Sequence, residues 1–242
     1  MKNGRDEVNQ KRRMTLIPIA SLIALLSGAF FLYVSDYYRA DDVAVAVLAT
    51  DTRLRVEKDT IILSPAAASD TALIFYPGAK VEYTAYLPIL EKIKSACGIT
   101  CILVKMPFNM AIFNVKAANA VMADHPEITN WYVGGHSMGG AMASDYASKN
   151  PDKVEGLILL GAYVYGSYPP EKALTVYGTF NTSVEKKIDY TENIVVIQGG
   201  NHAQFGNYGK QRGDPDATIS REAQQDIAVE AIRDFIMNGH ES

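Results

Sequence analysis

Seven short apolar runs, separated by segments with helical periodicity, constrain the fold of this chain more than any other feature. The runs cover residues 60–65, 71–78, 100–106, 130–135, 154–164, 173–178 and 193–200. They are nearly continuously apolar, which is typical of strands in a parallel sheet that is covered on both faces. Helical patterns lie between them over 82–96, 114–124 and 138–149, and a last helix begins near Ser220. This alternation predicts an α/β fold with a doubly wound, mostly parallel sheet.

The first 34 residues have a different composition. Residues 14–34 are a run of 21 residues without a charge, and a helix of that length spans the roughly 30 Å hydrocarbon core of a bilayer. Residues 1–13 are basic and several aspartates follow the run, so the positive-inside rule predicts a cytoplasmic N-terminus and an extracytoplasmic main domain. A transmembrane anchor is the interpretation that we favour. A cleaved signal peptide and a buried core helix are the alternatives.

The sequence therefore divides into four parts. We expect a cytoplasmic basic N-terminus over 1–13, a transmembrane anchor over 14–34, a stalk or edge element over 35–57 and the α/β domain over 58–242. The 242 residues carry a net charge of −4 and no basic stripe with interleaved aromatic residues, which argues against a nucleic-acid partner.

Ser137 lies in a Gly-x-Ser-x-Gly motif, at residues 135–139, between a predicted strand and a predicted helix. Glycines at both ends permit the tight turn that exposes a nucleophilic serine at the carboxyl edge of the sheet. The first turn of the following helix also favours developing negative charge. The alternative is a small residue in an ordinary strand-to-helix turn. In its sequence context the motif predicts a catalytic nucleophile.

A nucleophilic serine needs a general base, and the chain has four histidines. His136 is the variable position of the motif, where we expect its side chain to point away from the reaction. His125 precedes the strand and so lies at the opposite edge, and His240 lies in the C-terminal tail. His202 directly follows the last strand, at the same edge as Ser137, and is therefore the predicted base.

An oxyanion hole is predicted from two backbone N–H groups. One belongs to Met138, which follows the nucleophile. The other is assigned to Ala79, after the strand over 71–76, with Gly78 making the turn. The alternative for this segment is an ordinary strand-to-helix loop.

With these features the sequence resembles the α/β-hydrolase superfamily, and within it a bacterial, membrane-anchored, dienelactone-hydrolase-like group. The resemblance runs over about 58–238 and is carried by "FYPGAKVEYTAY", "MPFNMAIF", "GGHSMGGAMAS" and "GGNHAQFGNYG…GD…ATIS". It implies an α/β-hydrolase fold, Ser137 as nucleophile, His202 as base and metal-independent ester hydrolysis through an acyl-enzyme, without a cofactor. It also implies a bacterial cell membrane as the location of a single-pass anchor.

The third member of the triad is the open question. Such hydrolases usually place an aspartate after the strand that here covers 173–178, and this sequence has Asn181 at that position. Three interpretations remain: Asn181 orients His202 as an amide, Glu185 or Asp189 from the same loop replaces the acid, or the enzyme is impaired. Replacing aspartate by asparagine in a serine triad can lower turnover about 10⁴-fold, so the choice matters.

Two further features bear on function. Cys97 and Cys101 are expected to be reduced packing residues, with a disulfide as the alternative. Only a short segment separates the runs over 154–164 and 173–178, so we expect no lid domain and an open pocket. The sequence thus predicts a membrane-anchored serine hydrolase for small ester or acyl substrates. A catalytically impaired binding protein and an acyltransferase are the alternatives.

Overall fold

The computed structural model describes residues 4–239, so His240 and the first three residues of the predicted basic N-terminus lie outside the described part of the chain. The chain divides into two compact units, at residues 37 and 38. The first contains the helix α1 (Gly4–Ser35), and the second contains every other element.

Helix α1 has the length and composition of a membrane span over Pro18–Ser35, where the mean hydropathy is 1.9. Only 6% of this segment is buried. That exposure argues against the core-helix alternative, because the core helix of a globular protein covers its apolar side chains. The same properties occur in anchors and in signal sequences, so the helix is a candidate span by length and composition.

The second unit is built on one eight-stranded sheet. Its strands are β1 (Leu54–Val56), β2 (Thr60–Leu63), β3 (Thr71–Tyr76), β4 (Thr100–Val104), β5 (Asn130–His136), β6 (Gly156–Leu160), β7 (Ala173–Gly178) and β8 (Ile194–Ile197). Their order is β1-β2-β4-β3-β5-β6-β7-β8. The pairs β1–β2 and β2–β4 are antiparallel and all others are parallel. This arrangement confirms the predicted mostly parallel α/β sheet.

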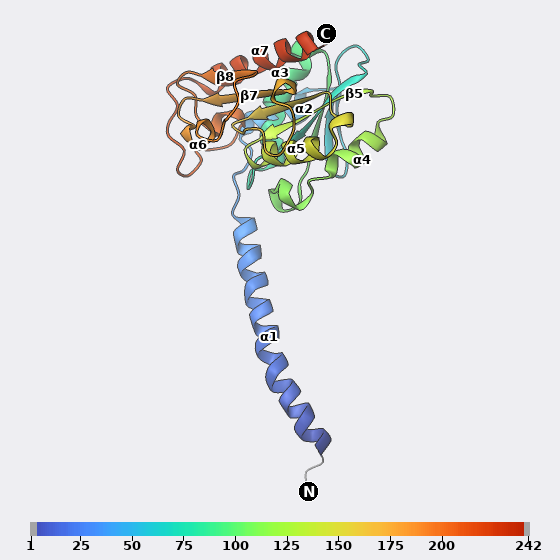
Figure 1. The fold of residues 1–242 in the computed structure, drawn as a ribbon, viewed down its shortest axis with the longest axis vertical. Helices are drawn as coiled ribbons and strands as arrows, with labels where there is room; N and C mark the ends of the chain where they lie inside the picture. Colours follow the sequence, from blue (N-terminus) through green and yellow to red (C-terminus); the bar gives the residue numbers. More distant parts are fainter. Residues whose placement is uncertain (1–3, 240–242) are drawn as a thin grey trace. The chain divides into compact units, whose positions relative to one another are not determined.

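Helices cover both faces of the sheet (Figure 1). One apolar core lies under α3 (Leu87–Cys97) and α7 (Arg221–Gly239), and the other lies under α4 (Ala117–Asp124) and α5 (Met138–Lys149). The central strand β3 shows why its sequence is continuously apolar: Leu73 and Phe75 enter the first core, whereas Ile74 and Tyr76 enter the second. A strand covered on both faces has no side for polar residues.

The remaining elements are short. They are α2 (Asp42–Thr50), α6 (Thr182–Glu185) and the 3₁₀ helices η1 (Tyr83–Tyr86), η2 (Pro107–Asn109), η3 (Ala111–Phe113), η4 (Pro151–Lys153), η5 (Pro170–Lys172) and η6 (Ala203–Phe205). Within the described chain, the β6–β7 connection holds η5 alone and no inserted lid domain, as predicted.

The boundary expected at residue 58 differs from the structure, because the compact unit already begins at Tyr38. Residues 38–57 contain α2 and β1, and α2 packs against α3 and η1. The Asp41 carboxylate caps α2 by accepting from the Ala44 N–H at 3.0 Å. At the other end, Asp51 forms a 2.6 Å ion pair with Lys94, whose side chain is 2% exposed. These contacts make the segment part of the domain, with β1 as its edge strand.

The thiols of Cys97 and Cys101 are free, as expected of packing residues. Cys101 lies within the first core, and burial raises its pKa above the usual thiol range. Burial likewise raises the pKa of Cys97 to about 11. Both groups are therefore protonated thiols at neutral pH, with little nucleophilic character.

Candidate active site

Ser137 occupies a strained turn between β5 and α5. Its backbone has φ 53° and ψ −124°, in the region that residues with a side chain rarely adopt. The turn is held by two backbone hydrogen bonds, from the Ser137 N–H to the Leu160 carbonyl at 3.0 Å and from the Ala141 N–H to the Ser137 carbonyl at 3.0 Å. Strain of about 1–3 kcal/mol persists only where its surroundings enforce it, and it is concentrated at functional sites.

The first turn of α5 packs closely against the end of β3. A Cβ atom at Gly139 would collide with the carbonyl oxygens of Tyr76 and Pro77, so only glycine fits there. This contact brings the loop that contains Ala79 beside the turn of Ser137. Met138 lines the pocket with Ser137, whereas Ala79 is half-buried and is not among the residues that line it. The predicted oxyanion donors therefore lie on adjoining segments.

His202 is on the loop after β8, which two elements hold in place. The buried Gln224 of α7 clamps Asn201, accepting from its N–H at 3.0 Å and donating to its carbonyl at 2.8 Å. On the other side, Asp214 accepts from the N–H groups of His202 at 3.1 Å and Ala203 at 2.8 Å. The imidazole is consequently carried by a fixed backbone.

Asn181 contacts the ring of His202. Its Nδ2 lies 2.7 Å from His202 Nδ1, and its Oδ1 accepts from the Ser183 hydroxyl at 3.0 Å. Glu185 and Asp189 are exposed and do not line the pocket. Of the alternatives for the third member, the structure brings Asn181 to His202 and leaves the two carboxylates outside.

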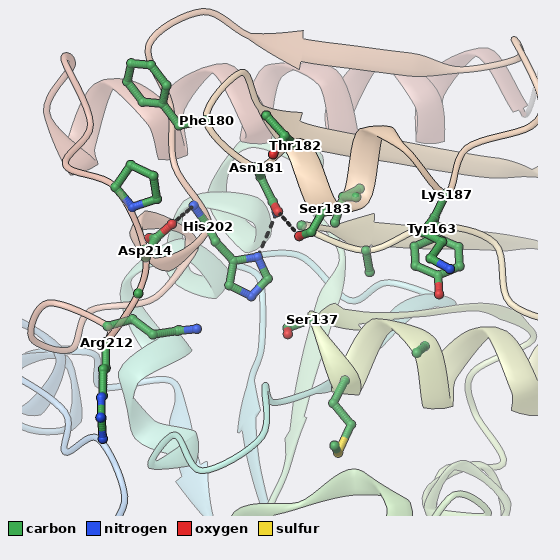
Figure 2. A pocket seen from close by; sticks show the side chains of 18 residues that line it. Ser137, Tyr163, Phe180, Asn181, Thr182, Ser183, Lys187, His202, Arg212 and Asp214 are labelled. Carbon is green, nitrogen blue, oxygen red and sulfur yellow. Dashed lines mark hydrogen bonds between the residues drawn. The ribbon is translucent and has the colours of Figure 1, made fainter.

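Figure 2 shows how the three side chains lie: Ser137 faces the imidazole of His202, and Asn181 lies on the other side of the ring. They border a cavity of about 620 Å³. Its other labelled side chains are Tyr163, Phe180, Thr182, Ser183, Lys187, Arg212 and Asp214. A cavity of this size accommodates a small organic ligand.

Behind His202 lies a buried hydrogen-bonded chain that sequence reasoning missed. His136 Nε2 is 2.9 Å from the His202 carbonyl oxygen, and its Nδ1 is 2.8 Å from the Tyr86 hydroxyl. The Tyr86 oxygen in turn accepts from the Gly78 N–H at 3.1 Å. A Cβ at Gly78 would lie 2.7 Å from that hydroxyl and 2.8 Å from His136 Nδ1, so glycine is required. These hydrogen bonds connect the loop of Ala79 to the loop of His202.

The groups at the two ends of this series of hydrogen bonds, the Gly78 N–H and the His202 carbonyl, determine the direction of every bond in it. Burial lowers the pKa of His136 well below its usual value, so the ring is neutral. Its Nε2 faces a carbonyl oxygen and must carry the proton, which leaves Nδ1 to accept from Tyr86. His136 was expected to point away from the reaction. It does not line the pocket, but its ring packs 4.5 Å from the ring of His202, centroid to centroid.

The electrostatic environment favours a neutral His202. Burial lowers the pKa of its imidazole, and the nearby carboxylate of Asp214 opposes that shift. A neutral imidazole at pH 7 can accept a proton, as a general base must. His125, by contrast, follows α4, contacts Glu127 at 3.1 Å and is not among the residues that line the pocket of Ser137. Among the described residues no group of three or more metal-binding side chains occurs.

Asp214 also had no predicted role. It belongs to the Gly-Asp pair that follows His202 by twelve residues, and this short spacing was the one available signal. A sequence does not show that the loop turns back so that its carboxylate reaches the backbone of His202.

Comparisons with known proteins agree with the fold described above. The model of the alpha/beta hydrolase family matches residues 72–226, more than half of the chain. No curated protein matches. Among solved structures, an esterase from Pyrobaculum calidifontis is 14% identical with a TM-score of 0.55, covering 80% of this chain and 89% of its own. Est1E from Butyrivibrio proteoclasticus, in a complex with ferulic acid, is 14% identical with a TM-score of 0.54, covering 76% and 96%. A thermostable esterase from Pseudomonas putida is 13% identical with a TM-score of 0.51, covering 78% and 87%. At these identities the likeness is one of fold.

Proposed function

Because the chain belongs to the alpha/beta hydrolase family, we propose that it is a serine hydrolase that cleaves carboxylic-ester-type bonds through an acyl-enzyme. The observation that carries the proposal is the 2.7 Å contact between Asn181 and His202 at the pocket that Ser137 enters in its strained turn. The side chains that we assign as nucleophile, base and orienting group thus border one cavity.

The proposed reaction has two steps, acylation of Ser137 and hydrolysis of the acyl-enzyme. In the first, His202 Nε2 takes the proton of the Ser137 hydroxyl while the serine oxygen bonds to the ester carbonyl carbon. The resulting oxyanion accepts hydrogen bonds from the N–H groups of Met138 and Ala79. Its collapse breaks the bond to the alcohol, which leaves with the proton from His202. In the second step, water replaces the alcohol and His202 returns the proton to Ser137, releasing the acid.

The amide of Asn181 supports this cycle in only one of its two orientations. For Nε2 to accept a proton, Nδ1 must carry one, and Nδ1–H must donate to the amide oxygen. A half-turn of the amide places Oδ1 there and turns Nδ2 to Ser183, whose hydroxyl can accept as well as donate. The opposite orientation, with Nδ2 donating to Nδ1, leaves the proton on Nε2 and blocks the base. This rotation is the basis of the impaired-enzyme alternative.

The open pocket supports a small, accessible ester or acyl substrate. No lid domain interrupts the β6–β7 connection in the described chain, and the lining combines aromatic side chains with hydroxyl, amide and charged groups. The structural relatives named above are esterases, which supports the same substrate class. A resemblance to dienelactone-hydrolase-like enzymes is part of this proposal.

For location, we propose a single-pass anchor in a bacterial cell membrane, with the hydrolase domain outside the cytoplasm. The support is the exposed apolar segment Pro18–Ser35 and the charge asymmetry around it. A cleaved signal sequence is the alternative, and N-terminal sequencing of the mature protein distinguishes the two.

Labelling with a fluorophosphonate probe, which modifies active serines, tests the catalytic proposal. We expect the wild type to be labelled, Ser137→Ala to lose the label, and Ser95→Ala, which changes an exposed serine of α3, to keep it. Persistent labelling of Ser137→Ala would overturn the assignment of the nucleophile. A folded wild type without label or esterase activity would support the binding-protein alternative, and product analysis with alcohol acceptors separates hydrolysis from acyl transfer.

A further inference from the structure

Asp214 is the only carboxylate among the residues that line the pocket of Ser137 and His202. Both of its oxygens accept backbone hydrogen bonds from the loop of the base, at 3.1 Å from the N–H of His202 and 2.8 Å from that of Ala203. Figure 2 shows Asp214 beside the backbone of His202, with Asn181 at the ring. The negative charge is therefore fixed next to the base by two bonds.

An aspartate in a serine triad performs two tasks. It orients the imidazole, and its charge stabilises the imidazolium that forms when the serine proton is transferred. Asn181 can perform the first task through its 2.7 Å contact, but a neutral amide brings no charge. The second task is consequently unassigned in this site.

The other titratable or charged groups that face His202 do not perform it. His136, from β5, packs against the ring and is neutral. Lys187 and Arg212 border the same pocket, but a basic side chain has the wrong sign to stabilise a positive charge on the ring. Only Asp214 has the required sign, and its charge acts against the effect of burial on the pKa of His202.

We propose that the two tasks of the triad acid are divided in this protein: Asn181 orients His202, and Asp214 supplies the negative charge that stabilises its protonated form. The inference rests on the proposed function and adds a positioning residue to it. Asp214 acts through His202 and its backbone, and it does not contact the reacting atoms.

The competing explanation is that Asp214 is only a clamp for the loop. A double-mutant cycle separates the two, because the charge is redundant when residue 181 is a carboxylate, whereas a clamp is needed in either background. The variants are Asp214→Asn, Asn181→Asp and the combination of both, compared with the full-length wild type. Asparagine at 214 keeps a side chain of the same size and one acceptor oxygen.

We expect Asp214→Asn alone to lower kcat/KM about tenfold and to move the acid limb of the pH profile down by about one unit, because an imidazolium without the charge is harder to form. In the Asn181→Asp background, the Asp214→Asn change should lower kcat/KM by less than about threefold. Equal losses in the two backgrounds would overturn the charge role and leave the clamp.

The pKa of His202, measured by NMR on the same four proteins, gives a readout that does not depend on turnover. Asp214→Asn should lower that pKa by about one unit. An unchanged pKa would overturn the inference even if activity falls. If the wild type neither hydrolyses esters nor reacts with the fluorophosphonate probe, the proposed function fails, and the NMR measurement still decides whether Asp214 stabilises the protonated ring.

Discussion

The Asn181 side chain lies between His202 and Ser183, 2.7 Å from the ring nitrogen of the first and 3.0 Å from the hydroxyl of the second. Both neighbours can act as donor or acceptor. The amide is thus a rotatable group with a partner in each orientation, and it holds the plane of the imidazole without fixing which nitrogen carries the proton. A carboxylate at this position would only accept, and would fix the productive tautomer.

Asn181→Asp should therefore raise kcat/KM, by about tenfold or more, because the carboxylate selects the Nδ1–H tautomer and stabilises the imidazolium. The acid limb of the pH profile should move to higher pH, since a nearby negative charge raises the pKa of His202. Steady-state kinetics between pH 5 and 9 measure both effects. Asn181→Leu, which has a similar size and no polar atoms, is the matched control and should lose most activity. If kcat/KM of Asn181→Leu were higher than that of the wild type, the orienting role of Asn181 would be contradicted.

Tyr86→Phe tests the buried hydrogen-bonded chain that runs from Gly78 through Tyr86 and His136 to the His202 carbonyl. The change removes one hydroxyl and leaves the Gly78 N–H and His136 Nδ1 without their shared partner, so we expect a loss of about 1–3 kcal/mol in the free energy of unfolding. Because the loops of Ala79 and His202 are joined through this chain, kcat should fall more than KM rises. Chemical denaturation and kinetics provide the measurements. Tyr83→Phe, also in η1, is the control, and an equal effect there would refute a specific role for the Tyr86 hydroxyl.

Acid should destabilise the domain. Burial lowers the pKa of both His136 and His202 in the folded state, whereas the unfolded chain has the ordinary value of about 6.5. Below that pH the unfolded state binds more protons, so the free energy of unfolding falls, by up to about 2.7 kcal/mol per pH unit for two histidines. The contribution is fully present above pH 6.5 and is lost as the pH falls through the folded-state values. Urea denaturation from pH 7.5 to 5 measures the slope.

One variant tests whether His136 contributes to this dependence of the free energy of unfolding on pH. His136→Gln removes one titrating group and keeps polar atoms near Tyr86 and the His202 carbonyl. It should be less stable than the wild type at neutral pH, with a clearly smaller loss on acidification. If the wild type and the variant lost stability in parallel between pH 6.5 and 5, the acid sensitivity would arise from other groups.

The buried ion pair of Asp51 and Lys94 attaches α2 to the domain. Asp51→Leu would leave the ammonium of Lys94 with Glu91 as its remaining partner at 3.6 Å. We therefore expect the free energy of unfolding to fall by an amount near the lower end of about 3–5 kcal/mol. The double variant Asp51→Leu/Lys94→Met should recover most of that loss, because no charge stays buried. Thermal and chemical unfolding measure both. A double variant as unstable as the single one would show that the pair acts through packing and not through charge.

Much of the fold could be predicted because the sheet is covered on both faces, and a doubly covered strand such as β3 has an unmistakable apolar sequence. Segment α2 was not predicted. Its valines at 43, 45 and 47 alternate as they do in a strand, and β-branched residues are weak helix formers. The helix forms because Asp41 caps it and because it packs against α3, which are local and tertiary contacts that override the pattern.

Ser137 and His202 could be predicted because sheet topology alone brings the carboxyl ends of β5 and β8 to one edge. Their catalytic roles stay predictions. The choice among Asn181, Glu185 and Asp189 depended on the path of the loop after β7, which no residue pattern encodes. Likewise, Tyr86 and His136 are fifty residues apart in sequence, and their contact exists only through packing.

The hydrogen bonds between Gln224 and Asn201 affect the order in which the parts of the candidate site form during synthesis. Ribosomes make a chain from its amino end, so Ser137 and its turn leave the ribosome well before α7, the last element in chain order. Until Gln224 is available, its hydrogen bonds of 3.0 and 2.8 Å to the Asn201 backbone are absent, and the loop of His202 has only the support from the side of Asp214 that the earlier residues provide. A nascent chain that has not yet completed α7 therefore has the residues of the Ser137 turn before the loop of His202 has both of its supports.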